Sequence, residues 1–319
     1  MEEFKYLIPE ESTDAATLNA RKLRELEAGF RKVFDRYGYE ELMLPSFEYV
    51  DLYHDFAQEE EKMFQFVNHE GKRIALRTDF SVPIARLYNN ANTADVGRYS
   101  YFGKVYRVQE RHKGRASELY QGGVELMGLP GKDGDRECLE VLEATLSTLP
   151  LTDVKLEFGS AKFFRRLNEL VNDERLKDIL DRKATSKMQA FVKDLDVDDN
   201  LKALLLALPS SFGDIDDLLK VKALCKDGML VEAIENLEYM YEKAKDKSRV
   251  MFDLCMIPTQ RYYTGIMVKA YTYHSAQPIL SGGRYDNLFR FFDRNVAAIG
   301  FSYRLDSVLN AIRKEEETQ

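Results

Sequence analysis

The feature that most constrains the fold is a long hairpin pattern at residues 99–128. Apolar and polar residues alternate through 99–107, a charged turn occupies 109–115, and the alternation returns at 118–126. Two runs with a period of two residues, joined by a polar turn that contains glycine, predict a long antiparallel hairpin. The sequence therefore favours a fold centred on an antiparallel sheet.

The same hairpin gathers polar side chains on one face. Arg107, Gln121, Gly123 and Glu125 have the parity to project to the same side of the two strands. A buried sheet face seldom carries an arginine, a glutamine and a glutamate together unless a ligand or neighbouring groups satisfy them. The pattern fits a binding site, and it fits equally well a structural arginine–glutamate pair across the strands.

Composition narrows the class of protein. The chain has 319 residues, of which 45% are hydrophobic and 31% charged, enough for one large or two medium domains. Its net charge of −8 disfavours a surface that neutralises nucleic-acid phosphates. Residues 1–12 are acidic and contain no apolar stretch, so no signal peptide is expected. No apolar run in the sequence approaches the length of a membrane span, so none is expected either.

The metal-binding residue types are scattered through the chain. They are Cys138, Cys225, Cys255, His54, His69, His112 and His274. No pair has the close spacing of a structural zinc site, so no metal is expected. Three widely separated cysteines are simplest to interpret as reduced thiols in a cytoplasmic protein.

The order of helical and strand patterns favours an α+β fold. Helices are predicted at 13–38, 81–89, 133–149, 285–292 and 305–314, and strands at 40–44, 63–67, 73–77, 154–159, 250–254, 265–273, 278–280 and 297–303. Most strands are joined by hairpins, which indicates an antiparallel sheet flanked by helices. Residues 161–247 are helical and highly charged. They are interpreted as an inserted helical subdomain between core segments 1–160 and 248–319.

Six segments in this order resemble class II aminoacyl-tRNA synthetases, and among them the histidyl-tRNA synthetase catalytic core. The first helix, the next strand and Pro45 are similar to motif 1, which builds the dimer interface in that class. The hairpin is similar to motif 2, and residues 76–79 are similar to the segment that presents an acidic residue to the substrate amino group. Residues 257–265 and 280–288 are similar to the two histidine signatures, and 298–308 to motif 3. The resemblance implies a class II synthetase-like antiparallel sheet flanked by helices.

The resemblance also implies a histidine pocket made of Asp79, Arg107, Gln121, Glu125, Tyr262 and Tyr263. Asp79 would pair with the α-ammonium group, Arg107 and Gln121 would bind the α-carboxylate and backbone polar groups, and Glu125 and the tyrosines would bind the imidazole. Each residue also has a structural interpretation: a helix N-cap for Asp79, a cross-strand pair for Arg107 and Glu125, and core packing for the tyrosines.

The departures from the synthetase pattern concern ATP. Pro258 stands where the family carries an arginine, and Arg261 falls where it carries an acidic residue. Asp306 and Ser307 replace the Glu-Arg pair of motif 3, and Gln109 replaces the acidic residue after the motif 2 arginine. Two missing arginines on the phosphate side would each reduce an adenylation rate by roughly a hundredfold or more. The resemblance therefore implies no catalytic residue in this chain.

Only 12 residues follow Ser307, so the anticodon-binding domain of histidyl-tRNA synthetases is not expected. A synthetase core that keeps histidine recognition but loses ATP chemistry resembles the regulatory subunits of ATP phosphoribosyltransferase, the first enzyme of histidine biosynthesis. That family implies activation of a short-form catalytic subunit in a hetero-octamer of four plus four chains. It also implies pairing of the regulatory chains through motif 1, histidine as the inhibiting effector, no other cofactor, and neither tRNA nor a membrane as a partner.

Two other functions remain open from the sequence. The chain could be a truncated histidine-activating synthetase paralogue, and histidine-dependent exchange of pyrophosphate into ATP would reveal that activity. It could also be a phosphate-binding or nucleic-acid module that uses Arg111, Lys113, Arg115 and Arg284. The acidic net charge makes a solvated turn the better interpretation of residues 109–117.

Overall fold

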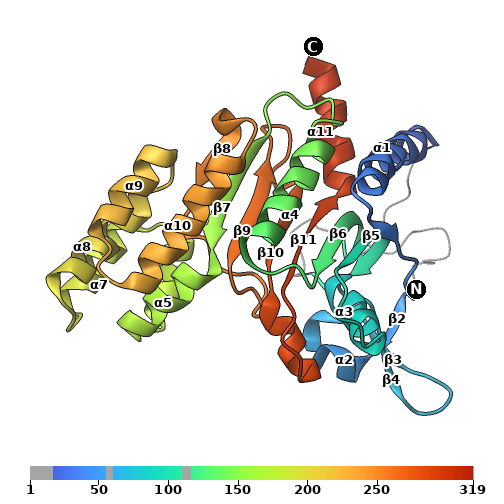
Figure 1. Ribbon diagram of the computed structural model, residues 1–319, viewed down its shortest axis with the longest axis horizontal. Coiled ribbons are helices and arrows are strands. Elements are labelled where there is room, and N and C mark those ends of the chain that lie inside the picture. Colours follow the sequence, from blue (N-terminus) through green and yellow to red (C-terminus); the bar gives the residue numbers. More distant parts are fainter. Residues whose placement is uncertain (1–16, 55–59, 110–115, 319) are drawn as a thin grey trace, which may run out of the picture.

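The computed structural model describes residues 17–54, 60–109 and 116–318. Within these ranges eight strands form one sheet in the order β1-β5-β6-β11-β10-β9-β7-β8 (Figure 1). Their bounds, in that order, are Glu40–Glu41, Gly97–Tyr106, Glu118–Met127, Ala298–Arg304, Leu280–Arg284, Ile266–Tyr271, Lys155–Ser160 and Val250–Phe252. The outermost pairs, β1–β5 and β7–β8, are parallel, and the inner pairs are antiparallel.

The long hairpin predicted from the sequence is confirmed. Strands β5 and β6 pair in one continuous antiparallel register, from Gly97 opposite Met127 to Tyr106 opposite Glu118. Residues 110–115 of its turn lie outside the described ranges. Because side chains alternate across a strand, Val124 and Leu126 enter one apolar core while Glu125 points to the other face.

Three helices cover the first face of the sheet: α1 (Thr17–Arg36), α4 (Gly131–Leu146) and α11 (Leu305–Thr318). Helix α1 packs on both α4 and α11, and α4 packs against β11 (Figure 1). Phe30 and Phe34 lie one turn apart on α1, and together with Leu142 of α4 they are buried in the core between helices and sheet. Helix α1 ends before Gly38, whose φ of +75° is readily adopted only by glycine.

A second, smaller sheet lies beside the other face. Its order is β2-β4-β3, with bounds Phe47–Tyr49, Arg73–Leu76 and Gln65–Val67, and both pairs are antiparallel. The neighbouring helices are α2 (Val50–His54), η2 (Glu60–Lys62) and α3 (Ser81–Asn90). These elements share a separate apolar core with the Glu125 side of the hairpin, to which Tyr101 and Val105 contribute.

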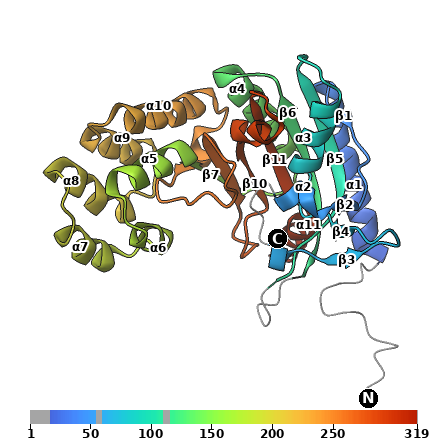
Figure 2. The same cartoon turned by 90° about the horizontal axis from the view of Figure 1, so that it is seen from below.

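Between β7 and β8 the chain is helical. The elements are α5 (Ala161–Val171), α6 (Arg175–Asp181), α7 (Thr185–Lys193), α8 (Asp199–Ala207), η3 (Leu208–Ser210), α9 (Ile215–Leu224), α10 (Gly228–Lys243) and η4 (Lys247–Arg249). They lie beyond the β7–β8 edge of the sheet (Figures 1 and 2). The side chains of Ser160, Asp198, Asp214 and Asp227 cap α5, α8, α9 and α10, as short polar side chains do at helix N-termini.

Three predicted elements differ from the structure. The strand at 278–280 is displaced, because β10 runs from Leu280 to Arg284 and so includes two glycines. The helix at 285–292 is the 3₁₀ helix η5 (Asp286–Phe292), and the strand at 40–44 is reduced to Glu40–Glu41. In β10 the glycines are needed for close packing, since a Cβ on Gly282 would collide with the backbone of β11. No helix in the described ranges is both long and apolar enough to cross a membrane.

Candidate functional site

The six side chains predicted to bind histidine line one cavity of about 290 Å³: Asp79, Arg107, Gln121, Glu125, Tyr262 and Tyr263. They come from separate parts of the chain. Asp79 precedes α3, Arg107 follows β5, Gln121 and Glu125 lie on β6, and the tyrosines lie between β8 and β9. The sheet register explains part of this convergence, since Gly103 pairs with Gln121 and Tyr99 with Glu125.

Glu125 is the most deeply buried charged group of the cavity, with 2% of its surface exposed. The Ser81 hydroxyl donates a hydrogen bond of 2.6 Å to Oε1, and the Tyr285 hydroxyl donates to Oε2. Burial raises the pKa of Glu125 to about 7, against the opposing effect of those hydrogen bonds. Glu125 can therefore change its protonation state, and with it its hydrogen-bonding character, near neutral pH.

Arg107 does not pair with Glu125. Its Nε donates a hydrogen bond of 2.7 Å to the backbone oxygen of Thr78, and the Glu125 oxygens are taken by hydroxyl donors. The cross-strand ion pair that was the structural interpretation of these two residues is thus wrong. The bond to Thr78 instead links Arg107 to the segment that carries Asp79, so both side chains are held at the cavity wall.

Asp79 holds the first turn of α3, although the N-cap position itself is Phe80, and it also lines the cavity. Its Oδ1 accepts a hydrogen bond of 2.9 Å from the Val82 backbone N–H in the first turn of α3, while Thr78 Oγ1 lies 3.3 Å from Oδ2. The residue is 5% exposed. One carboxylate can cap a helix and still face a ligand, because it has about four acceptor positions. The two interpretations of Asp79 are compatible.

Aromatic rings form part of the cavity wall. The ring of Tyr262 meets those of Tyr263 and Tyr285 edge-on, with both pairs of centroids 5.8 Å apart. Tyr101 also lines the cavity and stacks on Phe80 with a centroid distance of 4.1 Å. Such arrangements are favourable for aromatic pairs and hold the rings in fixed orientations.

Several lining residues were missed by the sequence reasoning: Ser81, Tyr101, Lys269, Tyr285 and Arg304. The sequence could have indicated Tyr101, because it lies an even number of residues before Arg107 and so faces the same side of the strand. Tyr285 lies inside a segment already assigned to a histidine signature. Nothing local marked Lys269 or Arg304, because their proximity to the cavity depends on how β9 and β11 are placed in the sheet.

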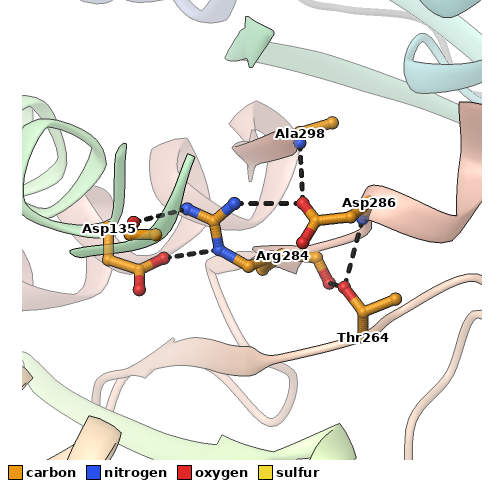
Figure 3. A network of polar contacts seen from close by, with 6 residues as sticks. Asp135, Thr264, Arg284, Asp286 and Ala298 are labelled. Atoms are coloured by element: carbon orange, nitrogen blue, oxygen red, sulfur yellow. Dashed lines mark hydrogen bonds and ion pairs between the residues drawn. The ribbon is translucent and has the colours of Figure 1, made fainter. Parts of the chain in front are cut away.

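Arg284 belongs to the interior and does not fit a phosphate-binding surface. Its Nε contacts Asp135 Oδ1 at 2.8 Å, and its Nη1 contacts Asp286 Oδ1 at 3.0 Å (Figure 3). Its Nη2 donates a 2.9 Å hydrogen bond to the backbone oxygen of Gly131, and its own carbonyl accepts one of 2.7 Å from the Thr264 N–H. Arg111, Lys113 and Arg115 lie outside the described residues.

This network holds backbone segments next to cavity residues. It joins the start of α4, the end of β10 and the segment before β9, and Asp286 also accepts a hydrogen bond of 2.8 Å from the Ala298 N–H (Figure 3). Tyr263 directly precedes Thr264, and Tyr285 directly follows Arg284. The network therefore fixes the backbone that carries two of the cavity's aromatic rings. Arg284 is therefore a positioning residue.

The raised pKa of Glu125 leads to a pH-dependent stability. Because the folded-state pKa exceeds the ordinary value, the neutral carboxyl's contribution is fully present below about pH 4.5 and is lost as the pH rises through 7. Relative to Glu125→Gln, the wild-type protein should lose roughly 2–3 kcal/mol of unfolding free energy between pH 5 and pH 8. Urea unfolding across that range measures the difference. Glu118→Gln, on the same strand but outside the cavity, is the control; parallel wild-type and Glu125→Gln profiles would contradict the assignment.

Known proteins resemble the chain over nearly its full length. A profile of the histidyl-tRNA synthetase family matches residues 12–308. The ATP phosphoribosyltransferase regulatory subunit of Lactococcus lactis subsp. lactis (strain IL1403) is 38% identical, over 99% of this chain and 98% of that protein. The one from Ruminiclostridium cellulolyticum is 32% identical, over 100% and 79%.

Solved structures show the same fold. A Bacillus halodurans C protein described as an ATP phosphoribosyltransferase regulatory subunit/histidyl-tRNA synthetase has a TM-score of 0.88 at 26% identity, over 98% of this chain and 84% of its own. Histidyl-tRNA synthetase from Nostoc sp. PCC 7120 has a TM-score of 0.73 at 17% identity, over 98% and 75%. The predicted α+β class and the class II synthetase-like sheet are confirmed.

Proposed function

Because the chain belongs to the histidyl-tRNA synthetase family and, within it, to the regulatory subunits of ATP phosphoribosyltransferase, we propose that it senses histidine for that enzyme. In this proposal it performs no chemistry of its own. It activates a short-form catalytic subunit, and histidine bound in the cavity shifts the assembly to an inhibited state. The assembly has four regulatory and four catalytic chains.

The observation that carries the proposal is the set of charges around one small cavity. A free amino acid presents an ammonium group, a carboxylate and a side chain, and histidine adds an imidazole that can donate or accept hydrogen bonds. Asp79 supplies an anion, Arg107 a cation, and Glu125 a buried carboxyl at the walls of the same cavity. A volume of about 290 Å³ lies at the lower end of ligand sites, which suits a single amino acid.

The cavity walls come from two different sheets, which suggests how histidine binding could be transmitted to the catalytic subunit. Asp79 follows β4 of the small sheet, whereas Gln121 and Glu125 belong to the central sheet. A ligand that bridges them would favour one relative position of the two sheets. Such coupling requires different affinities for the two states, typically about 1–3 kcal/mol.

The direct test is to mix the purified chain with a short-form catalytic phosphoribosyltransferase. We expect the catalytic rate to rise on mixing and to fall again when histidine is added. No change in rate on mixing would rule out activation. Activation that histidine does not reverse would rule out the sensing role. Appreciable histidine-dependent exchange of pyrophosphate into ATP by the chain alone would establish the adenylating alternative.

We also propose that two copies of the chain pair through the motif 1 region. Strand β2 reverses the usual pattern, because Phe47 and Tyr49 face outward while Glu48 is buried and pairs with Arg86 at 2.8 Å. Phe66 of β3 lies edge-on to Phe47 at 5.4 Å, and the nearby Met43 is 97% exposed. An exposed apolar patch of this kind is typical of a protein interface.

Phe47→Glu should weaken self-association by about a hundredfold or more, because the carboxylate would be desolvated at the interface. Sedimentation velocity over a concentration series measures the effect, with circular dichroism as a check on folding. Leu219→Glu replaces a residue of similar exposure on α9 and should leave association unchanged. An unchanged dimer in Phe47→Glu would place the interface elsewhere.

A further inference from the structure

A second group of metal-binding side chains lies away from the cavity. Asp153 precedes β7, His274 lies in the turn after β9, and Glu315 is on α11. One potential ligand atom from each lies within 4.8 Å of the other two. None of the three lines the cavity. The group therefore joins three segments that are distant in sequence and is separate from the proposed histidine site.

Glu315 provides an independent reason to expect a ligand. The residue is 5% exposed, and its Oε1 accepts hydrogen bonds from the Thr152 N–H at 3.1 Å and the Thr152 hydroxyl at 2.7 Å. Its Oε2 is buried and accepts no hydrogen bond from any described residue. A buried carboxylate oxygen is stable only with a partner, and a cation is the partner that compensates its charge most directly.

The other two residues are held in place by their surroundings. The Asp153 oxygens lie 2.7 and 2.8 Å from the Thr272 hydroxyl, and Oδ2 also accepts a 2.6 Å hydrogen bond from the Tyr273 N–H. The His274 carbonyl accepts a hydrogen bond of 3.2 Å from Lys314. These contacts fix the backbone of the turn and leave the His274 ring as the group that offers a nitrogen to the cluster.

The donor set identifies the chemical class of the ligand. Within the described chain neither carboxylate forms an ion pair with the His274 ring, although all three groups are close. Zn²⁺ accepts both imidazole nitrogen and carboxylate oxygen ligands, whereas Mg²⁺ and Ca²⁺ prefer oxygen alone, so a set with one imidazole favours Zn²⁺ over those two ions. Bonds of about 2.0–2.2 Å to a single ion would draw these ligand atoms closer together than the 4.8 Å within which they now lie.

We propose that Asp153, His274 and Glu315 bind one Zn²⁺ ion and thereby fasten helix α11 to the β7 end of the sheet. A site built from three distant segments has none of the short spacings by which zinc sites are found in sequences. This explains how the sequence could indicate no metal while the fold assembles a set of ligands. The positive charge of Lys314 next to His274 should limit the affinity, so we expect micromolar binding.

Calorimetric titration of the EDTA-treated full-length protein with Zn²⁺ tests the proposal. We expect one equivalent to bind, and we expect His274→Ala and Glu315→Gln each to weaken binding by at least tenfold. His69→Ala, an exposed histidine in the β3–β4 turn, should leave it unchanged. Zinc should also raise the melting temperature of the wild type but not of His274→Ala, which gives a second measurement if one variant folds poorly.

Cobalt provides a spectroscopic check on the same ligands. Co²⁺ bound in place of Zn²⁺ should give visible absorption bands that weaken in His274→Ala. Three results would overturn the proposal: no binding or melting shift at millimolar Zn²⁺, binding that is insensitive to His274→Ala, or Mg²⁺ bound as tightly as Zn²⁺. The last result would indicate oxygen ligands without the imidazole.

Discussion

Glu125→Gln should weaken histidine binding by about 10- to 150-fold, which corresponds to roughly 1.5–3 kcal/mol for a hydrogen bond to a charged group. In the proposed complex the Glu125 carboxylate accepts a hydrogen bond from the imidazole at the most buried point of the cavity. Glutamine keeps the shape of the side chain but removes its charge and one acceptor oxygen. Isothermal titration calorimetry with the isolated chain measures the change.

A matched pair of variants separates charge from structure at the same site. Glu118→Gln makes the same chemical change on β6 outside the cavity and should leave the dissociation constant unaltered. Asp79→Asn keeps a side-chain oxygen for the Val82 N–H while removing the charge that would pair with the ammonium group, so it should weaken binding at nearly unchanged stability. Wild-type affinity in both Glu125→Gln and Asp79→Asn would refute the site.

Arg284→Met should destabilise the fold by about 3–5 kcal/mol, the largest stability effect that we expect from a single substitution in the site region. Arg284 and Asp135 are both buried, and each is the other's main charge partner (Figure 3). Removing the guanidinium leaves the Asp135 carboxylate buried without its cation and withdraws the donor to Gly131. Such a loss is a large fraction of the 5–15 kcal/mol that stabilises most domains.

Urea unfolding of Arg284→Met gives the free-energy change. Arg136→Met is the control, because Arg136 pairs with Asp133 and Glu140 at the surface of α4 and should change stability by less than about 1 kcal/mol. Equal effects of the two variants would show that burial of the Arg284 network contributes little. Arg284→Met should also weaken histidine binding, since the network holds the backbone next to Tyr263 and Tyr285.

The elements that could be predicted from the sequence are those whose pattern is local. Alternation identified the β5–β6 hairpin, which the register of the sheet confirms, and it placed Arg107, Gln121 and Glu125 on one face, where all three line the same cavity. The predicted position of strand β10 was wrong because Gly282 and Gly283, which lie within it, are residues typical of a turn. Their role depends on the neighbouring strand β11, which requires backbone without side chains at that position.

What could not be predicted depends on distant contacts. Arg284 was considered as a phosphate ligand because nothing near it in sequence shows that Asp135 neutralises it. The group Asp153, His274 and Glu315 was invisible for the same reason. The alternative of an Arg107–Glu125 pair failed because the Ser81 and Tyr285 hydroxyls donate hydrogen bonds to the Glu125 carboxylate. Those hydroxyls come close to Glu125 only in the folded chain.

The position of the helical segment has a consequence for synthesis on the ribosome. Strand β7 pairs with β8 on one side and β9 on the other, and both partners follow the helices in the chain. While α5–α10 are being translated, β7 therefore has two unpaired edges, which are prone to join other chains. Rapid local folding of those helices would return the nascent chain to β7 as soon as β8 emerges, and so shorten that exposure.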